Sequence, residues 1–216
     1  MSHKVLIVTA VAAERESILA ALHGDERFDI IAGGVGPAAA AASTAIALSG
    51  ASYRYVFCMG IGGSYREPVQ FDAVVIADEV IAADLGAESP EGFIRLDELG
   101  FGETRIPADR ELANLVATTL RQANVQVTTG SILTVSTATG TEQTATKLKQ
   151  RFPQASAEGM EGYGVAVGAQ KYQIPFIEIR TVSNKVGLRD RAAWKIKEAL
   201  AQLTVISAIL RKGLPL

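Results

Sequence analysis

The chain has 216 residues, of which 48 % are hydrophobic and 20 % are charged, and its formal net charge is −2. This length predicts a single domain with a well-buried core, spanning residues 1–216. The small negative charge provides no basic field for phosphates or anionic lipids, so we expect neither nucleic acid nor a membrane as a partner. Chemistry on a small molecule becomes the favoured class of function.

Cysteine and histidine are scarce in the sequence. Cys58 is the only cysteine, which excludes an intramolecular disulfide and fits a reducing cytoplasm. His3 and His23 are too few for a histidine metal site or a histidine-based triad. We therefore expect no metal and no organic cofactor, and acid–base chemistry from carboxylates or amides. The first apolar stretch, residues 5–13, is too short to span a membrane.

Short apolar, β-branched runs alternate with helical stretches, which predicts a mostly parallel sheet covered by helices. The expected strands are Lys4–Ala12, Phe28–Ala32, Tyr55–Met59, Ala73–Ala77, Gln126–Val135 and Phe176–Val182. The expected helices are Ala13–Leu22, Pro37–Leu48, Arg110–Gln122, Glu142–Arg151, Glu161–Lys171 and Asp190–Arg211. Between the fourth strand and the third helix, Asp84–Thr104 lacks a sustained period, and it indicates an irregular excursion that is either a binding flap or a surface insertion.

Glu14 comes directly after the first expected strand. Ligands of open α/β sheets bind at the carboxyl ends of the strands, where a carboxylate can hold and deprotonate a water molecule. The helix macrodipole also favours an acidic residue in a first helical turn, which is a purely structural reason for Glu14. The spacing alone leaves both roles open.

Two glycine clusters follow strands, at residues 33–36 and 60–63. Glycines at such positions let backbone N–H groups approach a phosphate, a carboxylate or a sugar, although tight turns between packed elements are an equal explanation. Neither cluster has the spacing G-x-G-x-x-G, and the turn after the first strand has no glycine. Binding of NAD is therefore disfavoured.

The segment Glu158-Gly159-Met160-Glu161-Gly162 opens an otherwise apolar helix in this interpretation. A buried carboxylate requires a partner, and a pair of ribose hydroxyls would serve as one for Glu161. Met160 offers a soft apolar surface for a sugar or a base. An acidic first turn with no functional role is the alternative.

The expected strand Phe176–Val182 ends in a run of hydrogen-bonding residues that begins at Arg180 and includes Ser183 and Asn184. Asn184 has both a donor and an acceptor, which suits the edge of a heterocycle. A helix cap or an Asx-turn is the structural alternative for this side chain.

Taken in order, these stretches resemble the nucleoside phosphorylase and nucleosidase family, particularly its methylthioadenosine/S-adenosylhomocysteine nucleosidase branch, over nearly the whole chain. The resemblance implies an α/β fold, a single-domain three-layer sandwich with a mixed, mostly parallel central sheet flanked by helices. It also implies a homo-oligomer, a dimer or larger. The stretches that carry the resemblance are Ala10–Glu14, Gly34–Gly36, Gly60–Gly63, Val135–Ser136, Phe152–Ala155 with Met160–Glu161, and Pro175–Phe176 with Arg180 and Ser183–Asn184.

The resemblance also implies roles for individual residues. Glu161 would bind the ribose 2′-hydroxyl, Met160 would pack on the sugar, and Glu14 would position the attacking water. Asn184 would act on the leaving base as the second catalytic residue. Further substrate contacts are expected at Gly62, Gly63, Thr137, Ala138 and Ser183.

Two departures from the family pattern narrow the expected reaction. Family phosphorylases hold phosphate with a Gly-Asp-Pro segment after the first strand, and this chain has Thr9–Glu14 there, so water is the expected nucleophile. Adenine-releasing members have an aspartic acid at the position of Asn184. A 6-oxopurine is a better leaving group than adenine, and a neutral amide donor suffices for it. The sequence therefore predicts a hydrolase that releases hypoxanthine from a small-molecule purine nucleoside.

Three alternatives remain at this stage: an adenine-directed nucleosidase, a phosphorylase, and a nucleoside-binding module without catalysis. The stretch from Ser183 to Trp194 further resembles family members whose inosine substrate has a benzoate-bearing 5′ extension. A benzoate requires a cation, and the candidates are Arg66, Arg95, Arg189 and Arg191.

Overall fold

The fold was analysed in a computed structural model that describes residues 4–215, so His3 lies outside the described residues. The main sheet contains β1 (Val5–Thr9), β2 (Phe28–Ala32), β3 (Tyr55–Ser64), β4 (Ala73–Ala82), β7 (Arg105–Pro107), β8 (Gln126–Thr134), β9 (Ala155–Gly159) and β10 (Phe176–Lys185). The helices are α1 (Ala12–Leu22), α2 (Pro37–Gly50), α3 (Arg110–Gln122), α4 (Glu142–Arg151), α5 (Gly162–Lys171) and α6 (Ile196–Gly213).

The main sheet is mixed and partly closed on itself. Its strands follow the order β10-β4-β8-β9-β3-β1-β2, and β10 also pairs with β3. The pairs β1–β2, β1–β3, β10–β3, β4–β8 and β8–β9 are parallel, whereas β10–β4, β3–β9 and β4–β7 are antiparallel. Because β3 pairs with β1, β9 and β10, its carboxyl end is the point where the side chains of several strands converge.

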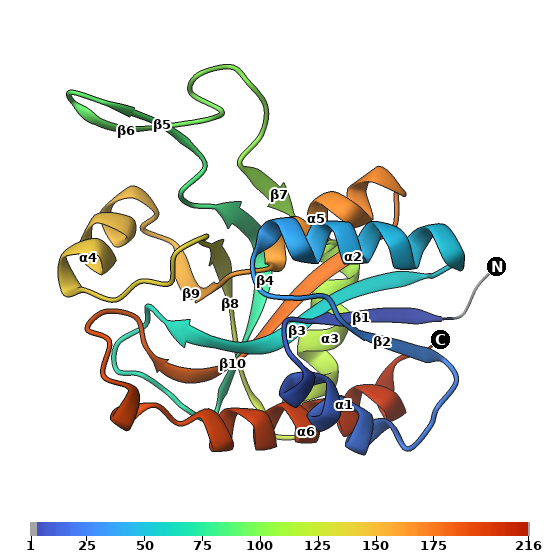
Figure 1. Ribbon diagram of the computed structural model, residues 1–216. Coiled ribbons are helices and arrows are strands. Elements are labelled where there is room, and N and C mark those ends of the chain that lie inside the picture. Colours follow the sequence, from blue (N-terminus) through green and yellow to red (C-terminus); the bar gives the residue numbers. More distant parts are fainter. Residues whose placement is uncertain (1–3, 216) are drawn as a thin grey trace.

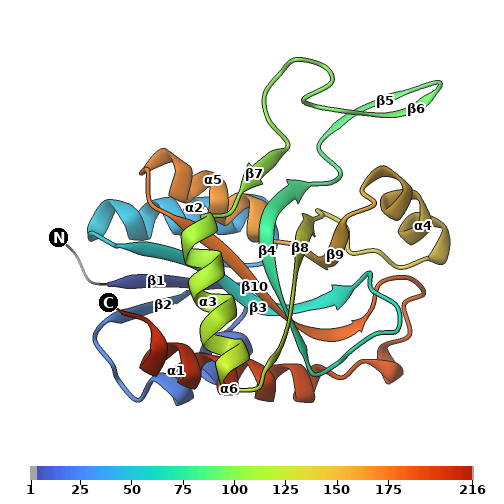
Figure 2. The ribbon, with the colours of Figure 1, turned by 180° about the vertical axis from the view of Figure 1, so that it is seen from behind.

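Helices cover both faces of the sheet, which confirms the three-layer architecture (Figure 1). One core cluster joins the sheet to α2 and α5, with Ala40 and Val165 among its buried residues. A second joins the opposite face to α1, α3 and α6, with Ile18, Val116 and Leu203 buried, and Figure 2 shows these helices from behind. The buried faces of the helices and the apolar strands thus form the expected sandwich.

The structure differs from the expected elements at several places. β9 was missed because Ala-Ser-Ala-Glu-Gly lacks the β-branched residues typical of strands, although all five of its residues are buried. The excursion Asp84–Thr104 contains a hairpin of β5 (Gly86–Ser89) and β6 (Gly92–Arg95), drawn beyond the sheet in Figure 1. The prediction of irregular structure was therefore wrong for the first half of that segment.

Two further differences concern ends of elements near the expected site. The last helix does not begin at Asp190, because the Asp190 side chain accepts from the amide of Ala192 and starts a short 3₁₀ turn; α6 begins only at Ile196. The strand β3 continues through Gly60–Gly63, past its expected end at Met59. An added Cβ on Gly62 would lie 2.7 Å from the carbonyl oxygen of Glu158, so glycine permits this close approach of β9.

Candidate active site

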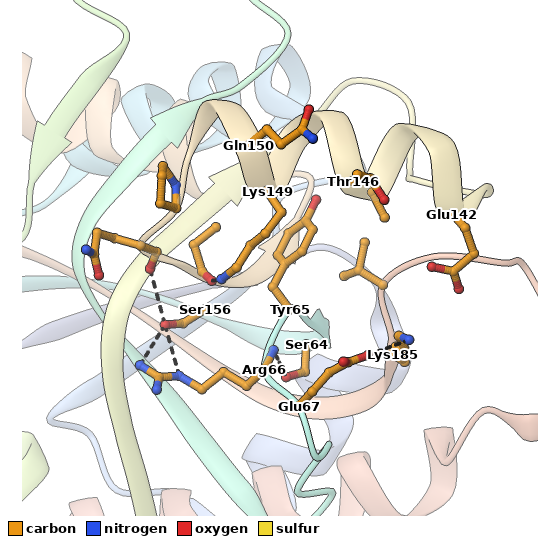
Figure 3. Close-up of a pocket in the computed structure, with 15 residues that line it drawn as sticks. Ser64, Tyr65, Arg66, Glu67, Glu142, Thr146, Lys149, Gln150, Ser156 and Lys185 are labelled. Carbon is orange, nitrogen blue, oxygen red and sulfur yellow. Dashed lines mark hydrogen bonds and ion pairs between the residues drawn. The ribbon is translucent and has the colours of Figure 1, made fainter.

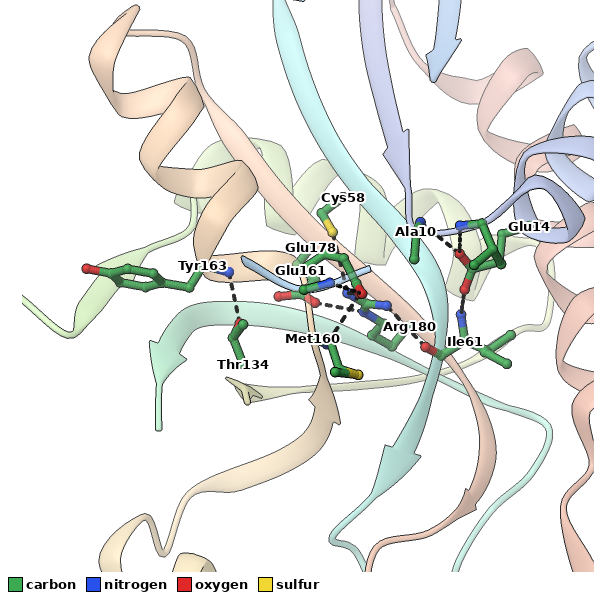
Figure 4. Close-up of polar contacts among 12 residues, drawn as sticks. Ala10, Glu14, Cys58, Ile61, Thr134, Met160, Glu161, Tyr163, Glu178 and Arg180 are labelled. Atoms are coloured by element: carbon green, nitrogen blue, oxygen red, sulfur yellow. Dashed lines mark hydrogen bonds and ion pairs between the residues drawn. The ribbon is translucent and has the colours of Figure 1, made fainter. Parts of the chain in front are cut away.

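Glu14 is held rigidly in the first turn of α1. Its side chain is buried, and Oε2 accepts from the backbone amides of Ala10 at 2.9 Å and Val11 at 3.3 Å. Oε1 accepts from the amide of Ile61 on β3 at 2.9 Å (Figure 4). These contacts fix the carboxylate between the β1–α1 turn and β3, and Oε1 keeps a lone pair for a further donor.

Arg180, on β10, connects most of the buried charges. Its Nε donates to Glu178 at 2.7 Å, and its terminal nitrogens donate to the carbonyl of Ile61 at 3.1 Å and the sulfur of Cys58 at 3.5 Å. A terminal nitrogen also lies 3.0 Å from Oε2 of Glu161. Burial lowers the pKa of Arg180, but the two adjacent carboxylates outweigh it, so its pKa is raised and the guanidinium stays charged.

Glu161 caps the amino end of α5 rather than lying inside it. Besides Arg180, its carboxylate accepts from the amide of Gly36 at 3.2 Å and from the amide of Met160 at 3.3 Å. The partner that a buried Glu161 was expected to need is therefore present within the chain, as Arg180. Gly36, with φ of 91°, immediately precedes α2, so Glu161 also links the amino ends of two helices.

Glu14 and Arg180 approach each other across Gly60. An added Cβ on Gly60 would lie 2.5 Å from Glu14 Oε1 and 2.9 Å from a terminal nitrogen of Arg180. On β9, an added Cβ on Gly159 would lie 2.7 Å from Cζ of Arg180. The absence of side chains at these glycines therefore lets one guanidinium contact Glu161 while it lies close to Glu14.

Ser183 and Asn184 lie at the carboxyl end of β10, where a register shift opposite β3 brings Asn184 beside Gly63. Oγ of Ser183 lies 2.8 Å from Oδ1 of Asn184 and 3.2 Å from the carbonyl of Gly62. Nδ2 of Asn184 donates to the carbonyl of Lys185 at 2.8 Å. Asn184 thus belongs to a strand end and is not a helix cap.

The remaining predicted contact residues lie in β3, directly after β9, and in the loop before α4. Gly62 and Gly63 are buried in β3, and Met160 is partly buried against a small apolar cluster that includes Tyr65. Thr137 is exposed and Ala138 half-buried in the loop between β8 and α4. Glu14 contacts Ile61 of β3 directly, Glu161 is connected to the same residue through Arg180, and Ser183 contacts Gly62 further along this strand.

The sequence-based prediction assigned no role to three charged residues of this region, Glu178, Arg180 and Glu158. For Glu178 and Arg180 the available signal was their position in the apolar strand β10, since a buried charge requires a partner. Glu158 gave no such signal, because β9 was not predicted as a strand. Burial raises the pKa of Glu178 and Arg180 partly opposes that rise. Oε2 of Glu178 is buried without a hydrogen-bond partner among the described residues, and it faces Gly162, where a Cβ would overlap it.

The arginines proposed for an anionic extension differ in their surroundings. Arg95 is paired with Asp97 at 3.0 Å and with Glu98 at 3.0 Å, so its charge is already compensated. The amide of Arg189 donates to the carbonyl of Gly140, and its guanidinium lies 5.1 Å from the ring centroid of Trp194. Arg191 is exposed in the 3₁₀ turn.

The largest cavity described, of about 770 Å³, lies between α4 and the end of β3 (Figure 3). Arg66, Lys149 and Tyr65 line it, and the guanidinium of Arg66 contacts Oγ of Ser156 at 3.2 Å. The lining of this cavity does not include Glu14 or Glu161. It does include Lys185, which directly follows Asn184 in the chain. This cavity is therefore next to the predicted site rather than part of it.

Residues 4–215 contain no helix that is long and apolar enough to cross a membrane. The same residues contain no group of three or more histidine, cysteine, aspartate or glutamate side chains arranged to hold a metal ion.

The mixed sheet closed around β3, with a buried carboxylate at its end and a second carboxylate held by an arginine, defines an α/β protein of the nucleoside phosphorylase type. Comparison with protein families agrees, because the model of the phosphorylase superfamily matches residues 3–211. The chain belongs to this superfamily.

Individual relatives extend this result. The chain is 43 % identical to the futalosine hydrolase of Streptomyces coelicolor, with 93 % of this chain and 92 % of that protein covered. It is 45 % identical to the futalosine hydrolase of Acidothermus cellulolyticus, with 94 % and 88 % covered. Among solved structures, the native futalosine hydrolase of Helicobacter pylori aligns with a TM-score of 0.85 at 17 % identity, covering 97 % of this chain and 98 % of that one, which confirms the fold.

Proposed function

We propose that this chain is a hydrolase that cleaves the N-glycosidic bond of futalosine, releasing hypoxanthine and dehypoxanthine futalosine in menaquinone biosynthesis. The identity of 43 % and 45 % to two futalosine hydrolases over most of their lengths supports the substrate. The observation that carries the chemistry is Glu14, whose buried carboxylate is aligned by three backbone amides and keeps an acceptor site on Oε1.

In this proposal Glu14 accepts a hydrogen bond from a water molecule and takes its proton as the water oxygen bonds to C1′. The electron pair of the C1′–N9 bond leaves with the base, so the sugar passes through an oxocarbenium-like state. The proton is finally delivered to the departing base, which leaves as neutral hypoxanthine. The net reaction adds OH to the sugar and H to the base.

Glu161 and Arg180 act on the sugar in this proposal. Glu161 accepts from the ribose 2′-hydroxyl, and this contact strengthens as positive charge grows on the ring. Arg180 holds Glu161 in position through the 3.0 Å ion pair. Met160 precedes Glu161 in the chain and supplies an apolar surface beneath the sugar.

Asn184 acts on the leaving base. Its amide group donates to N7 of the purine as negative charge develops there and on O6. Ser183, at 2.8 Å, holds the Asn184 side chain. A neutral amide is adequate for a 6-oxopurine, and this favours futalosine over the adenine nucleosides that are the second candidate.

For the anionic end of the 5′ extension, we propose Arg189. It adjoins Gly140, in the same loop as the predicted contacts Thr137 and Ala138. Among the described residues it forms no ion pair with a carboxylate, whereas Arg95 has two. The proposal also includes a cytoplasmic homo-oligomer, a dimer or larger, which light scattering on the purified protein tests.

The proposal is tested by incubating the protein with futalosine, inosine and methylthioadenosine, each with and without phosphate, and identifying the released base by chromatography. Hypoxanthine from futalosine in phosphate-free buffer is the expected result. Adenine from methylthioadenosine at a comparable rate would assign the chain to the adenine-directed alternative. A strict requirement for phosphate would make it a phosphorylase, and no release from any substrate would favour a binding module.

A further inference from the structure

Glu158, on β9, is a buried carboxylate that the proposed mechanism does not use. It is 8 % exposed, and its Oε1 accepts from the backbone amide of Thr139 at 2.8 Å. Its Oε2 accepts from Oγ1 of Thr139 at 2.6 Å and from the hydroxyl of Tyr65 at 2.8 Å. Burial, together with the adjacent carboxylate, raises the pKa of Tyr65, so the phenol remains a donor.

The charge of Glu158 has no structural explanation. Among residues 4–215, the ion pairs include none between Glu158 and a lysine or arginine. A neutral acceptor could bind the same three donors without the cost of taking a charge out of water. Within the described part of the chain, Oε1 has one donor, the amide of Thr139, so it can accept one more hydrogen bond.

The position of Glu158 relates it to the proposed base site. Glu158 on β9 and Asn184 on β10 both pair with Gly63, which lies between them on β3. Residues paired across neighbouring strands project to the same face of a sheet, and two strand spacings separate them by about 10 Å. A purine with a hydrogen bond at each end spans a similar distance, so the two side chains can form hydrogen bonds with opposite edges of one base.

We infer that Glu158 recognises the N1–H edge of a 6-oxopurine, with Oε1 accepting the hydrogen bond while Asn184 contacts the N7 side. This inference rests on the proposed function and specifies how the site discriminates between hypoxanthine and adenine. Hypoxanthine has a donor at N1, whereas adenine has a lone pair there that a carboxylate repels. Glu158 also accepts the hydrogen bond from the amide of Thr139, and this amide could otherwise donate to N1 of adenine.

The test compares kcat/KM for futalosine and for its 6-amino analogue in wild type, Glu158→Leu, Glu158→Gln and the surface control Glu67→Gln. Glu158→Leu should lower the preference for the 6-oxo substrate by about 100-fold, because it removes the acceptor and frees the Thr139 amide. Glu158→Gln keeps an acceptor oxygen opposite Thr139 but loses the negative charge that repels N1 of adenine, so its preference should lie between those of wild type and Glu158→Leu. Glu67→Gln should leave the preference unchanged. An equal loss for both substrates in Glu158→Leu would overturn the inference.

A second measurement needs no variant, which covers the case in which Glu158→Leu does not fold. Free hypoxanthine, 1-methylhypoxanthine and adenine are compared as inhibitors of the wild-type protein. Hypoxanthine should inhibit at a concentration at least about tenfold lower than the other two, because only it presents N1–H. Equal inhibition by all three would refute the role of Glu158. A wild type without activity on futalosine would instead contradict the proposed function itself.

Discussion

The guanidinium of Arg180 and the carboxylate of Glu161 form a 3.0 Å ion pair in which the side chains are only 3 % and 5 % exposed. The same guanidinium binds Glu178 at 2.7 Å, so one cation compensates two buried carboxylates. The ion pair therefore holds Glu161 in a fixed orientation at the proposed sugar site. Loss of the arginine would leave two negative charges in the core.

Replacing Arg180 by methionine should destabilise the protein by about 3–5 kcal/mol, because removal of one partner leaves uncompensated buried charge. The free energy of unfolding in urea measures this loss. Arg105→Met is the matched control, since Arg105 pairs with Glu79 near the surface, and it should cost no more than about 1 kcal/mol. Similar losses in both variants would show that the buried ion pairs of Arg180 contribute no more to stability than the more exposed pair of Arg105.

Gly60→Ala should reduce kcat/KM by about 100-fold or more with little effect on the fold, because the added Cβ displaces Glu14 or Arg180. Steady-state kinetics with futalosine measures the effect. Gly50→Ala, at the end of α2 where a Cβ meets nothing within 4 Å, should keep full activity. Full activity in Gly60→Ala would mean that the carboxylate and the guanidinium need not approach each other there.

Arg189→Ala should raise KM for futalosine about tenfold and leave the kinetics with inosine unchanged, because only futalosine has the anionic extension. Arg95→Ala is the control, since Arg95 already pairs with two acidic residues. Equal increases in KM for both substrates would place Arg189 elsewhere in the site.

Cys58 should resist thiol reagents in the folded protein. It is 1 % exposed, and burial raises the pKa of its thiol well above the usual range although Arg180 partly opposes this. Ellman's reagent at pH 8 should therefore label it only after unfolding in guanidinium chloride, because the reactive form is the thiolate. Rapid labelling of the native protein would show that the region around Arg180 opens to solvent.

The sequence was sufficient for the layers of the fold, but not for the contacts between the side chains of the candidate site. Apolar periodicity located most helices and strands, and acidic or amide residues after strands indicated Glu14 and Asn184. The pair of Arg180 and Glu161 depends on strand order, which local patterns do not encode. The strand β9 was not predicted because it is built of small residues, and Glu158 was consequently placed in a segment leading into the helix Glu161–Lys171.

The central claim, that Glu14 activates water for hydrolysis, is tested most directly by Glu14→Gln. Release of hypoxanthine from futalosine in phosphate-free buffer is followed for wild type, Glu14→Gln and Glu16→Gln, an exposed glutamate of the same helix. We predict that Glu14→Gln loses about 10²–10⁴-fold in kcat while Glu16→Gln retains the wild-type rate. Wild-type turnover by a folded Glu14→Gln protein would contradict the account.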